Sequence, residues 1–203
     1  MGGESEVSDE VLWRQVINGD GEAFGLLFDR HHERVRRHAL KLLGVPHLAE
    51  DVTAVVFYEA WRRRAHIRTV SNSILPWLLV TANNTVRNQL RQQRRYKHFL
   101  AQLPPPQDAA DIADGIAEAD ESRIKSSALR DAFAKLRPHE RDVLTLCVIE
   151  GMGAKEAGAA LGVAGGTVKS RLHRAKARLG AVYSQLLHEQ EPDAQAILGR
   201  RTS

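Results

Sequence analysis

The spacing of apolar residues constrains the fold of this 203-residue chain more than any other feature. Across residues 22–43, apolar side chains recur at nearly every third or fourth position, as Phe24, Leu27, Val35 and Ala39 illustrate, which is typical of one face of a helix. No segment alternates apolar and polar residues with the two-residue period of a half-buried strand. The sequence therefore predicts an all-α fold.

Glycine and proline mark the ends of the expected helices. Gly19-Asp20-Gly21 breaks the first helix, for which Ser8 or Asp9 is the expected cap, and Gly44-Val45-Pro46 ends the second. Pro76 fits the first turn of a helix, where the missing amide does no harm. We expect helices over residues 11–17, 22–43, 47–64 and 75–99, with a loop over residues 65–73.

A proline-rich and acidic segment divides the chain into two parts. Pro104-Pro105-Pro106 stops any helix, because proline lacks the backbone amide. Residues 61–107 and 157–188 contain no Asp or Glu, whereas six acidic residues lie between the prolines and Arg123. This order predicts two small cationic domains joined by a flexible acidic linker. The expected boundaries are residues 1–100 and 127–190 for the domains, 101–126 for the linker and 191–203 for a C-terminal tail.

The second part has the pattern of a helix-turn-helix. A short helix is expected over residues 154–161, ended by Gly162, and a basic helix follows the turn. One side of that helix is apolar and the other is small, polar and cationic, which suits the major groove of DNA. The alternative is a surface helix hairpin with solvated Lys and Arg. The candidate DNA contacts are Thr167, Lys169, Ser170, Arg171, His173, Arg174, Lys176 and Arg178.

These residues also carry a resemblance to a known family. Leu161-Gly162-Val163 followed by residues 166–175 resembles the C-terminal domain of bacterial sigma factors of the extracytoplasmic-function type, in the sigma-70 family. Leu136-Arg137-Pro138 and Arg141-Asp142-Val143-Leu144 resemble the entry to the same domain. Ala49-Glu50-Asp51-Val52, Phe57 and Ala60-Trp61 resemble the helix that grips core RNA polymerase, and Trp77-Leu78-Leu79, Ala82, Asn84 and residues 91–95 resemble the minus-ten recognition helix. The two matches cover residues 22–97 and 127–187, in the order of the family.

The resemblance implies a function and partners. The chain is expected to direct core RNA polymerase to specific promoters, using the first domain for the minus-ten element and the second for the minus-thirty-five element. Lys169, Ser170, His173 and Arg174 would face bases, whereas Thr167, Arg171, Lys176 and Arg178 would face phosphates. An anti-sigma factor is a further candidate partner. Core polymerase would contact Glu50, Asp51, Phe57 and Tyr58. The minus-ten contacts would be His66, Arg68, Ser71, Asn72, Asn84, Arg87, Asn88, Arg91, Arg94 and Arg95, the first four in a loop that captures a flipped base.

The chain departs from the family pattern at two places. The family often has Gln and Glu where Ala54 and Val55 stand in the polymerase-binding helix. It usually has Ser or Thr at the position of Ala164, before the basic helix. Because Ala offers no oxygen to the free amides of the first turn, this departure predicts a weaker N-cap, by about 1 kcal/mol.

Other functional classes find little support in the sequence. His31, His32, Glu33 and His38 look like metal ligands, but they lack the spacing of a zinc-protease helix and are expected on a solvated face. We therefore predict no catalytic residues, metal or cofactor. The alternatives are a stand-alone helix-turn-helix regulator and, from another class, a nucleic-acid-processing enzyme.

Localisation follows from the polar, acidic N-terminus and the single cysteine, Cys147, which permits no internal disulfide. No apolar run approaches the length that spans a membrane. A soluble cytoplasmic protein is expected.

Overall fold

A computed structural model of the chain describes residues 7–100 and 121–199. Within this part the chain is helical and forms no strand; only an isolated bridge joins Val70 and Ser73. The α-helices are α1 (Asp9–Ile17), α2 (Gly21–Leu43), α3 (Pro46–Arg62), α4 (Leu75–Leu100), α5 (Glu121–Ala134), α6 (Pro138–Leu144), α7 (Ala154–Leu161) and α8 (Gly165–Gly199). A 3₁₀ turn, η1 (Arg64–His66), follows α3, and a π turn, η2 (Thr145–Ile149), continues α6. The expected all-α class is confirmed.

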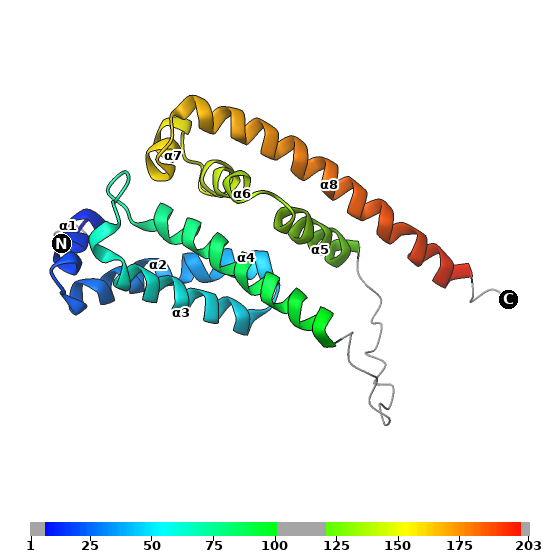
Figure 1. Cartoon of the computed structure of the whole chain (residues 1–203), viewed down its shortest axis with the longest axis horizontal. Coiled ribbons are helices and arrows are strands. Elements are labelled where there is room, and N and C mark those ends of the chain that lie inside the picture. Colours follow the sequence, from blue (N-terminus) through cyan, green and yellow to red (C-terminus); the bar gives the residue numbers. More distant parts are fainter. Residues whose placement is uncertain (1–6, 101–120, 200–203) are drawn as a thin grey trace, which may run out of the picture.

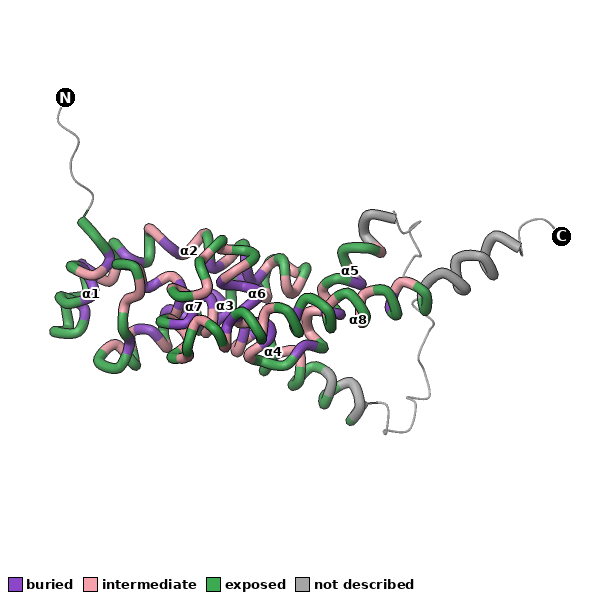
Figure 2. Tube along the Cα trace, turned by 90° about the horizontal axis from the view of Figure 1, so that it is seen from above, coloured by how far each residue is buried: buried purple, intermediate pink, exposed green. Residues whose placement is uncertain are grey.

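The helices form two bundles that lie against each other. Figure 1 shows α1 to α4, which we call the first bundle, on one side, and α5 to α8, the second bundle, on the other. Helix α8 runs along α5, α6 and α7, whereas α4 is the element of the first bundle that packs against α6, η2 and α7. Figure 2 shows the buried residues gathered between the helices, with much of α8 exposed.

Local sequence signals explain the helix ends of the first bundle. The Asp20 carboxylate caps α2 by accepting from the backbone N–H groups of Glu22 at 2.9 Å and Ala23 at 3.1 Å. Gly44 ends α2 at φ 72°, a left-handed conformation that glycine adopts without a steric penalty. Pro46 opens α3 at its first turn. The expected breaks at residues 19–21 and 44–46 are thus confirmed.

Each bundle has its own apolar core. The first core is built around fully buried residues of α1 to α4. Trp61 and Trp77 are partly buried and pack against this core, as their apolar neighbours in the sequence favour. The second surrounds Val143, Leu146 and Val168. A smaller cluster of Ala128, Ala132 and Leu186 joins α5 to the far half of α8.

The second bundle extends beyond the expected boundaries. Helix α5 begins at Glu121, inside the segment expected as linker, and α8 continues to Gly199, past the expected end at residue 190. The prolines at 104–106 and most of the acidic run lie outside the described residues. The expected helices over 22–43, 75–99 and 154–161 agree with α2, α4 and α7 within one residue at each end.

Candidate nucleic-acid interface

A close crossing of α7 and α8 forms the helix-turn-helix. Gly162 leaves α7 at φ 65°, and α8 begins three residues later. A Cβ at Gly158 would lie 2.6 Å from the carbonyl oxygen of Val163, and one at Gly165 would lie 3.3 Å from that of Ala154. At Gly158 the 2.6 Å contact with backbone admits only glycine unless the turn shifts, whereas at Gly165 a methyl group would need the neighbouring backbone to move by a few tenths of an ångström. The small residues of α7 therefore fix how α8 is presented.

Helix α8 turns a cationic face outward. Val168 and Ala175 are fully buried, whereas Lys169, Ser170, His173, Arg174 and Lys176 are exposed. The expected division into an apolar and a cationic side is thus present on the folded helix. The candidates Thr167 and Arg171 are half-buried beside this face, and Arg178 is exposed.

Two arginines of this face have different surroundings. The Arg178 guanidinium lies 3.8 Å from the buried carboxylate of Glu140 on α6, which links it to the scaffold. Among the residues that the structure describes, Arg174 donates only to the carbonyl of Ser170 on its own helix, at 3.2 Å. Its guanidinium therefore remains available to an acceptor outside the protein, such as a guanine edge.

Helix α4 presents a second polar face. Arg87, Asn88, Arg91 and Arg95 are exposed and Asn84 is half-buried, while the side chain of Arg94 lies outside the described part of the structure. A groove of about 590 Å³ separates α4 from α3. It is lined on the α4 side by Asn84, Asn88 and Gln92 and on the α3 side by Asp51, Glu59 and Arg63. Residues predicted to contact DNA and residues predicted to contact polymerase thus line the same groove.

The loop before α4 displays polar side chains on a tight turn. The backbones of Val70 and Ser73 exchange two hydrogen bonds, at 2.9 and 3.0 Å. Ser71 and Asn72 between them have φ values of 51° and 59°, the left-handed region that non-glycine residues adopt at a cost. Both side chains are exposed, as are those of His66 and Arg68. The four loop candidates are therefore accessible, and the 70–73 turn holds two of them at its tip.

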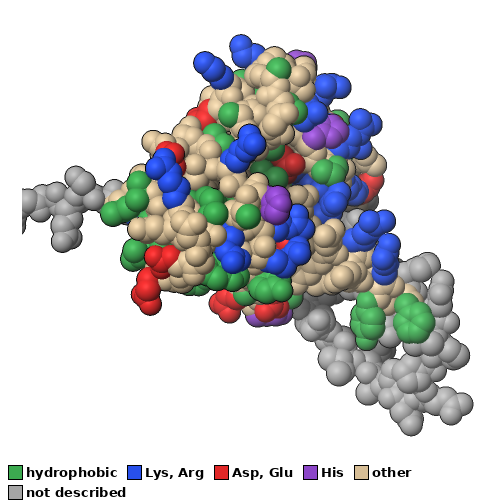
Figure 3. Space-filling model, turned by 60° about the vertical axis from the view of Figure 1, so that its left-hand side comes forward, with side chains coloured by type: hydrophobic (Ala, Val, Ile, Leu, Met, Phe, Trp, Pro, Cys, Tyr) green, Lys and Arg blue, Asp and Glu red, His purple; other side chains and the backbone are tan. Residues whose placement is uncertain are grey.

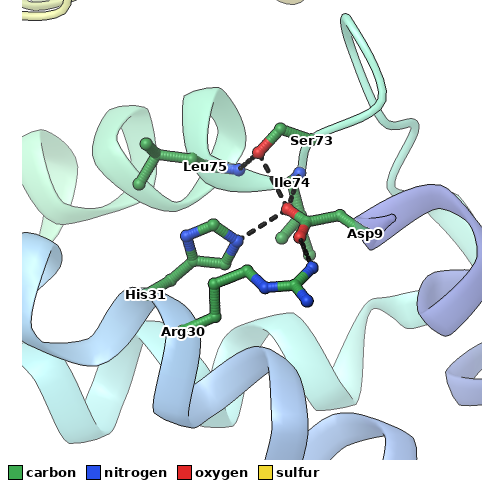
Figure 4. Close-up of polar contacts among 6 residues, drawn as sticks. All are labelled: Asp9, Arg30, His31, Ser73, Ile74 and Leu75. Carbon is green, nitrogen blue, oxygen red and sulfur yellow. Dashed lines mark hydrogen bonds and ion pairs between the residues drawn. The ribbon is translucent and has the colours of Figure 1, made fainter. Parts of the chain in front are cut away.

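A buried carboxylate anchors the end of this loop (Figure 4). Asp9 on α1 is 4% exposed and accepts hydrogen bonds from four donors. These are Arg30 Nη1 at 2.7 Å, His31 Nε2 at 2.6 Å, Ser73 Oγ at 2.8 Å and the backbone N–H of Ile74 at 3.0 Å. Burial alone would raise the pKa of Asp9, but these donors outweigh it and hold the pKa well below its ordinary value. Asp9 thus ties α1 and α2 to the start of α4.

The exposed face of α3 differs in part from the expected polymerase contacts. Glu50, Asp51 and Tyr58 are exposed, but Phe57 is only 4% exposed. Its ring packs edge-on against Phe28 at 4.7 Å in the core, so it cannot meet a partner directly. Val55, which the sequence marked only as a departure, is exposed one turn from Asp51 and from Tyr58. The available face is therefore Glu50, Asp51, Val55 and Tyr58.

The histidines of α2 are structural, and the solvated face expected for them is wrong. His31 and His38 are only 8% and 3% exposed. The ring of His31 forms a hydrogen bond with Asp9, and that of His38 forms one with Asn83. His32 is half-buried and stacks on Phe28, with the ring centroids 5.0 Å apart. No group of His, Cys, Asp or Glu among residues 7–100 and 121–199 has the arrangement of a metal site.

The charge over the described surface fits a nucleic-acid ligand. Figure 3 shows Lys and Arg side chains over the upper and right-hand parts of one face, with Asp and Glu mainly toward its lower edge. Such a cationic surface attracts phosphates without regard to sequence. In the portion of the chain that the structure covers, every helix is too short or too polar to cross a membrane.

Comparison with known proteins agrees with both bundles. The family model of sigma-70 region 2 matches residues 27–96, and that of sigma-70 region 4 matches residues 126–179. The RNA polymerase sigma factor NccH of Alcaligenes xylosoxydans xylosoxydans is 31% identical over 177 residues, which cover 86% of this chain and 94% of that protein. CarQ of Myxococcus xanthus, also an RNA polymerase sigma factor, is 28% identical over 169 residues, with 83% and 94% covered. The structure of CnrH in complex with the cytosolic domain of CnrY matches with a TM-score of 0.56 and 25% identity, over 88% of this chain and 99% of that one.

Proposed function

Because this chain belongs to the RNA polymerase sigma factors of the extracytoplasmic-function type, in the sigma-70 family, we propose a division of labour among its exposed faces. As a member of this family, the protein directs core RNA polymerase to promoters and initiates transcription by recognising the minus-ten and minus-thirty-five elements. What remains to be assigned is which residues do this. The observation that carries the assignment is the pair of exposed cationic helices, α4 and α8, on separate bundles.

In the second bundle, α8 would enter the major groove at the minus-thirty-five element. Lys169, Ser170, His173 and Arg174 stand on its most exposed side and would meet base edges. Thr167, Arg171, Lys176 and Arg178 flank them and would meet phosphates. The ion pair of Arg178 with Glu140 supports a positioning contact rather than a base contact for this residue, since its direction is set by α6.

In the first bundle, the 70–73 turn and α4 would bind the minus-ten element. Ser71 and Asn72 offer hydrogen-bonding groups at the tip of the turn, and His66 and Arg68 stand on the same loop. These four would capture an unstacked base. The polar face of α4, with Asn84, Arg87, Asn88, Arg91, Arg94 and Arg95, would hold the adjoining strand through bases and phosphates.

Core polymerase would bind α3. Its exposed face combines two carboxylates with the apolar surface of Val55 and the 63% exposed ring of Tyr58, a mixture typical of protein interfaces. We include Val55 and leave Phe57 out, because Phe57 supports α3 from the core.

The remaining expectations stand as proposals. The functional units would be residues 1–100 and 127–190, with the linker at 101–126 and the tail at 191–203, although α5 begins before residue 127 and α8 continues past residue 190. The protein would act in the cytoplasm, without catalytic residues or a cofactor of its own. The match to CnrH, whose structure was solved with the cytosolic domain of CnrY, supports a further protein partner, for which the family resemblance offers an anti-sigma factor.

Run-off transcription with purified core polymerase on a library of genomic promoters tests the function. The protein should start transcripts from a shared sequence motif, and Tyr58→Ala should reduce both co-purification with polymerase and transcript yield. Val11→Ala shortens another exposed apolar side chain, on α1, and serves as the control. Specific DNA binding without polymerase, together with no transcripts, would favour the stand-alone regulator, and metal-dependent DNA cleavage would favour the enzyme.

A further inference from the structure

A buried polar cluster joins the two bundles. Asn83 on α4 is 1% exposed, and its amide nitrogen donates to Asp142 Oδ1 at 3.1 Å and to Thr145 Oγ1 at 3.0 Å in the second bundle. Its amide oxygen accepts from His38 Nε2 on α2 at 2.9 Å. The amide of Asn83 finds partners for its oxygen and its nitrogen only in this arrangement, and a buried amide without them is costly, so Asn83 specifies one mutual arrangement of the bundles rather than general adhesion.

Two further contacts support this cluster. At its margin, Arg34 on α2 forms an ion pair with Glu150, directly after η2. Val80, three residues before Asn83 on the same face of α4, packs against the core of the second bundle. The contact between the bundles therefore has an apolar part, a buried polar part and a charged rim, as a specific interface does.

This arrangement brings acidic groups to the proposed base-capturing turn. A hollow of about 200 Å³ is lined by Val70, Ser71 and Ser73 on one side and by Glu150, Met152 and Glu156 on the other. Both glutamates are half-buried. A DNA strand that reached Ser71 would bring its phosphates next to these carboxylates, and like charges at short range repel.

The closed arrangement also has a cost. Arg141 on α6 is 3% exposed, and its Nε and Nη2 have no hydrogen-bond partner among the described residues. Burial lowers the pKa of Arg141, and the positive charge of Arg87 on α4 lowers it further. Asp142 offsets these effects only in part, so a buried cation with two unpaired donors opposes closure, and the interface can open when a competing partner offers more favourable contacts.

We propose that the contact of α4 with α6 and η2 is an autoinhibitory latch, in which Asn83 holds the bundles closed and Glu150 and Glu156 shield the 70–73 turn from DNA. The inference rests on the role proposed for that turn. Asn83 and Asn84 are neighbours on α4, so one helix presents one side to the second bundle and the adjacent side to the minus-ten strand. Promoter binding through the turn requires the latch to open.

The first test measures closure in the free full-length chain. In a Cys147→Ala background, cysteines at the exposed positions Asp29 on α2 and Ala181 on α8 carry a donor and an acceptor dye. The parent should show one short distance. Thr145→Val, which keeps the side-chain volume but removes the hydroxyl, should raise the ratio of open to closed molecules by about tenfold, the order expected when one or two hydrogen bonds are lost. Arg34→Ala removes an ion pair whose arginine is half exposed and should raise the ratio by about twofold to fivefold.

A matched control separates the latch from general loss of charge. Arg14 forms an ion pair with Glu10 within α1, which packs on α2 and η1 of the first bundle, so Arg14→Ala should leave the distance unchanged. Thermal melts of all variants show whether each still folds. If Thr145→Val does not fold, Arg34→Ala still tests the proposal, because it changes only an exposed side chain. A wild-type distance distribution as broad as that of the two latch variants overturns the proposal.

The second test links closure to promoter binding. Cysteines at Arg34 and Glu150 in the Cys147→Ala background can be joined by a bifunctional maleimide with a reducible spacer. The joined protein should lose run-off transcription and recover it after the spacer is cleaved, whereas Thr145→Val should bind a promoter duplex without polymerase about tenfold more tightly than the parent. Full transcription by the joined protein refutes the latch. If no form starts transcription, the parent included, the proposed function is refuted instead. The distances between the dyes then still show whether the two bundles are closed.

Discussion

Replacing Asp9 by Asn should unfold the first bundle at a much lower temperature. The substitution keeps the shape of the side chain but removes the charge that four donors share. Hydrogen bonds to a charged group contribute about 1.5–3 kcal/mol each, and removing one partner of a buried pair costs about 3–5 kcal/mol in total because the contributions are not additive. Arg30 keeps partial access to water, with 24% of its side chain exposed, so we take the lower end, about 3 kcal/mol.

The expected shift in melting temperature follows from the size of the bundle. For a cooperative unit of 60–100 residues, each kcal/mol corresponds to about 4–8 °C, which gives a fall of about 12–24 °C. Asp20→Asn is the matched control. It is the same chemical change at an exposed N-cap, where Asn serves about as well as Asp, so it should alter stability by no more than a few tenths of a kcal/mol.

The contribution of Asp9 to the unfolding free energy should also depend on pH. Because the folded state holds the pKa of Asp9 below its ordinary value of 3.8, the unfolded chain takes up the proton first as the pH falls. The stability that Asp9 contributes is therefore present above about pH 4 and is lost progressively below it. The difference in unfolding free energy between wild type and Asp9→Asn should shrink between pH 5 and pH 2.

Calorimetry or circular dichroism of the full chain measures both effects. Promoter binding should fall with stability in Asp9→Asn even well below its melting temperature, because Ser73 and Ile74 lose the anchor that positions the 70–73 turn. If Asp9→Asn melts within about 2 °C of Asp20→Asn, the carboxylate does not organise this bundle and our reasoning about the loop fails.

Three further predictions concern the second bundle. Gly158→Ala should destabilise it by about 1–3 kcal/mol, because the new methyl group meets a backbone oxygen at 2.6 Å, whereas Gly25→Ala in open space on α2 should stabilise by about 0.5–1 kcal/mol; urea titrations compare them. Ala164→Ser should raise the melting temperature by supplying the missing cap, and an unchanged value rejects the capping argument. Arg174→Ala should relax discrimination at one promoter position at a cost of about 1–3 kcal/mol, whereas Lys176→Ala should weaken all sequences alike and lower the salt slope; binding titrations at several salt concentrations would expose a reversal of these roles.

The local features of the fold were predictable from the sequence. Helix positions follow from apolar spacing, and the ends of α2 and α7 follow from Asp20, Gly44 and Gly162, whose conformational preferences act over a few residues. The cationic face of α8 was equally predictable, since residues three and four apart share a face whatever else the chain does. These inferences need no knowledge of which helices meet.

Contacts between distant residues were not predictable in this way. Asp9 meets Ile74 across 65 positions and Asn83 meets Thr145 across 62, and neither pair has a local signature. The expectation that His31 and His38 are solvated failed for this reason: their partners are supplied by tertiary packing. The burial of Phe57 was not predictable either, because the family resemblance points to a helix without saying which of its residues face inward.

Helix α4 couples the separate contacts, since it is one rigid element with several faces. Leu79 and Ala82 are fully buried, Asn83 meets the second bundle, and Asn84 lines the groove shared with α3. A ligand that binds only the open arrangement must supply the free energy that separates Asn83 from Thr145, so promoter affinity and closure oppose each other by the same amount. By that reciprocity, substitutions that strengthen closure should weaken promoter binding even though they touch no DNA. A regulator that binds both bundles together therefore need not cover either DNA-binding face, because stabilising the contact already present would be enough.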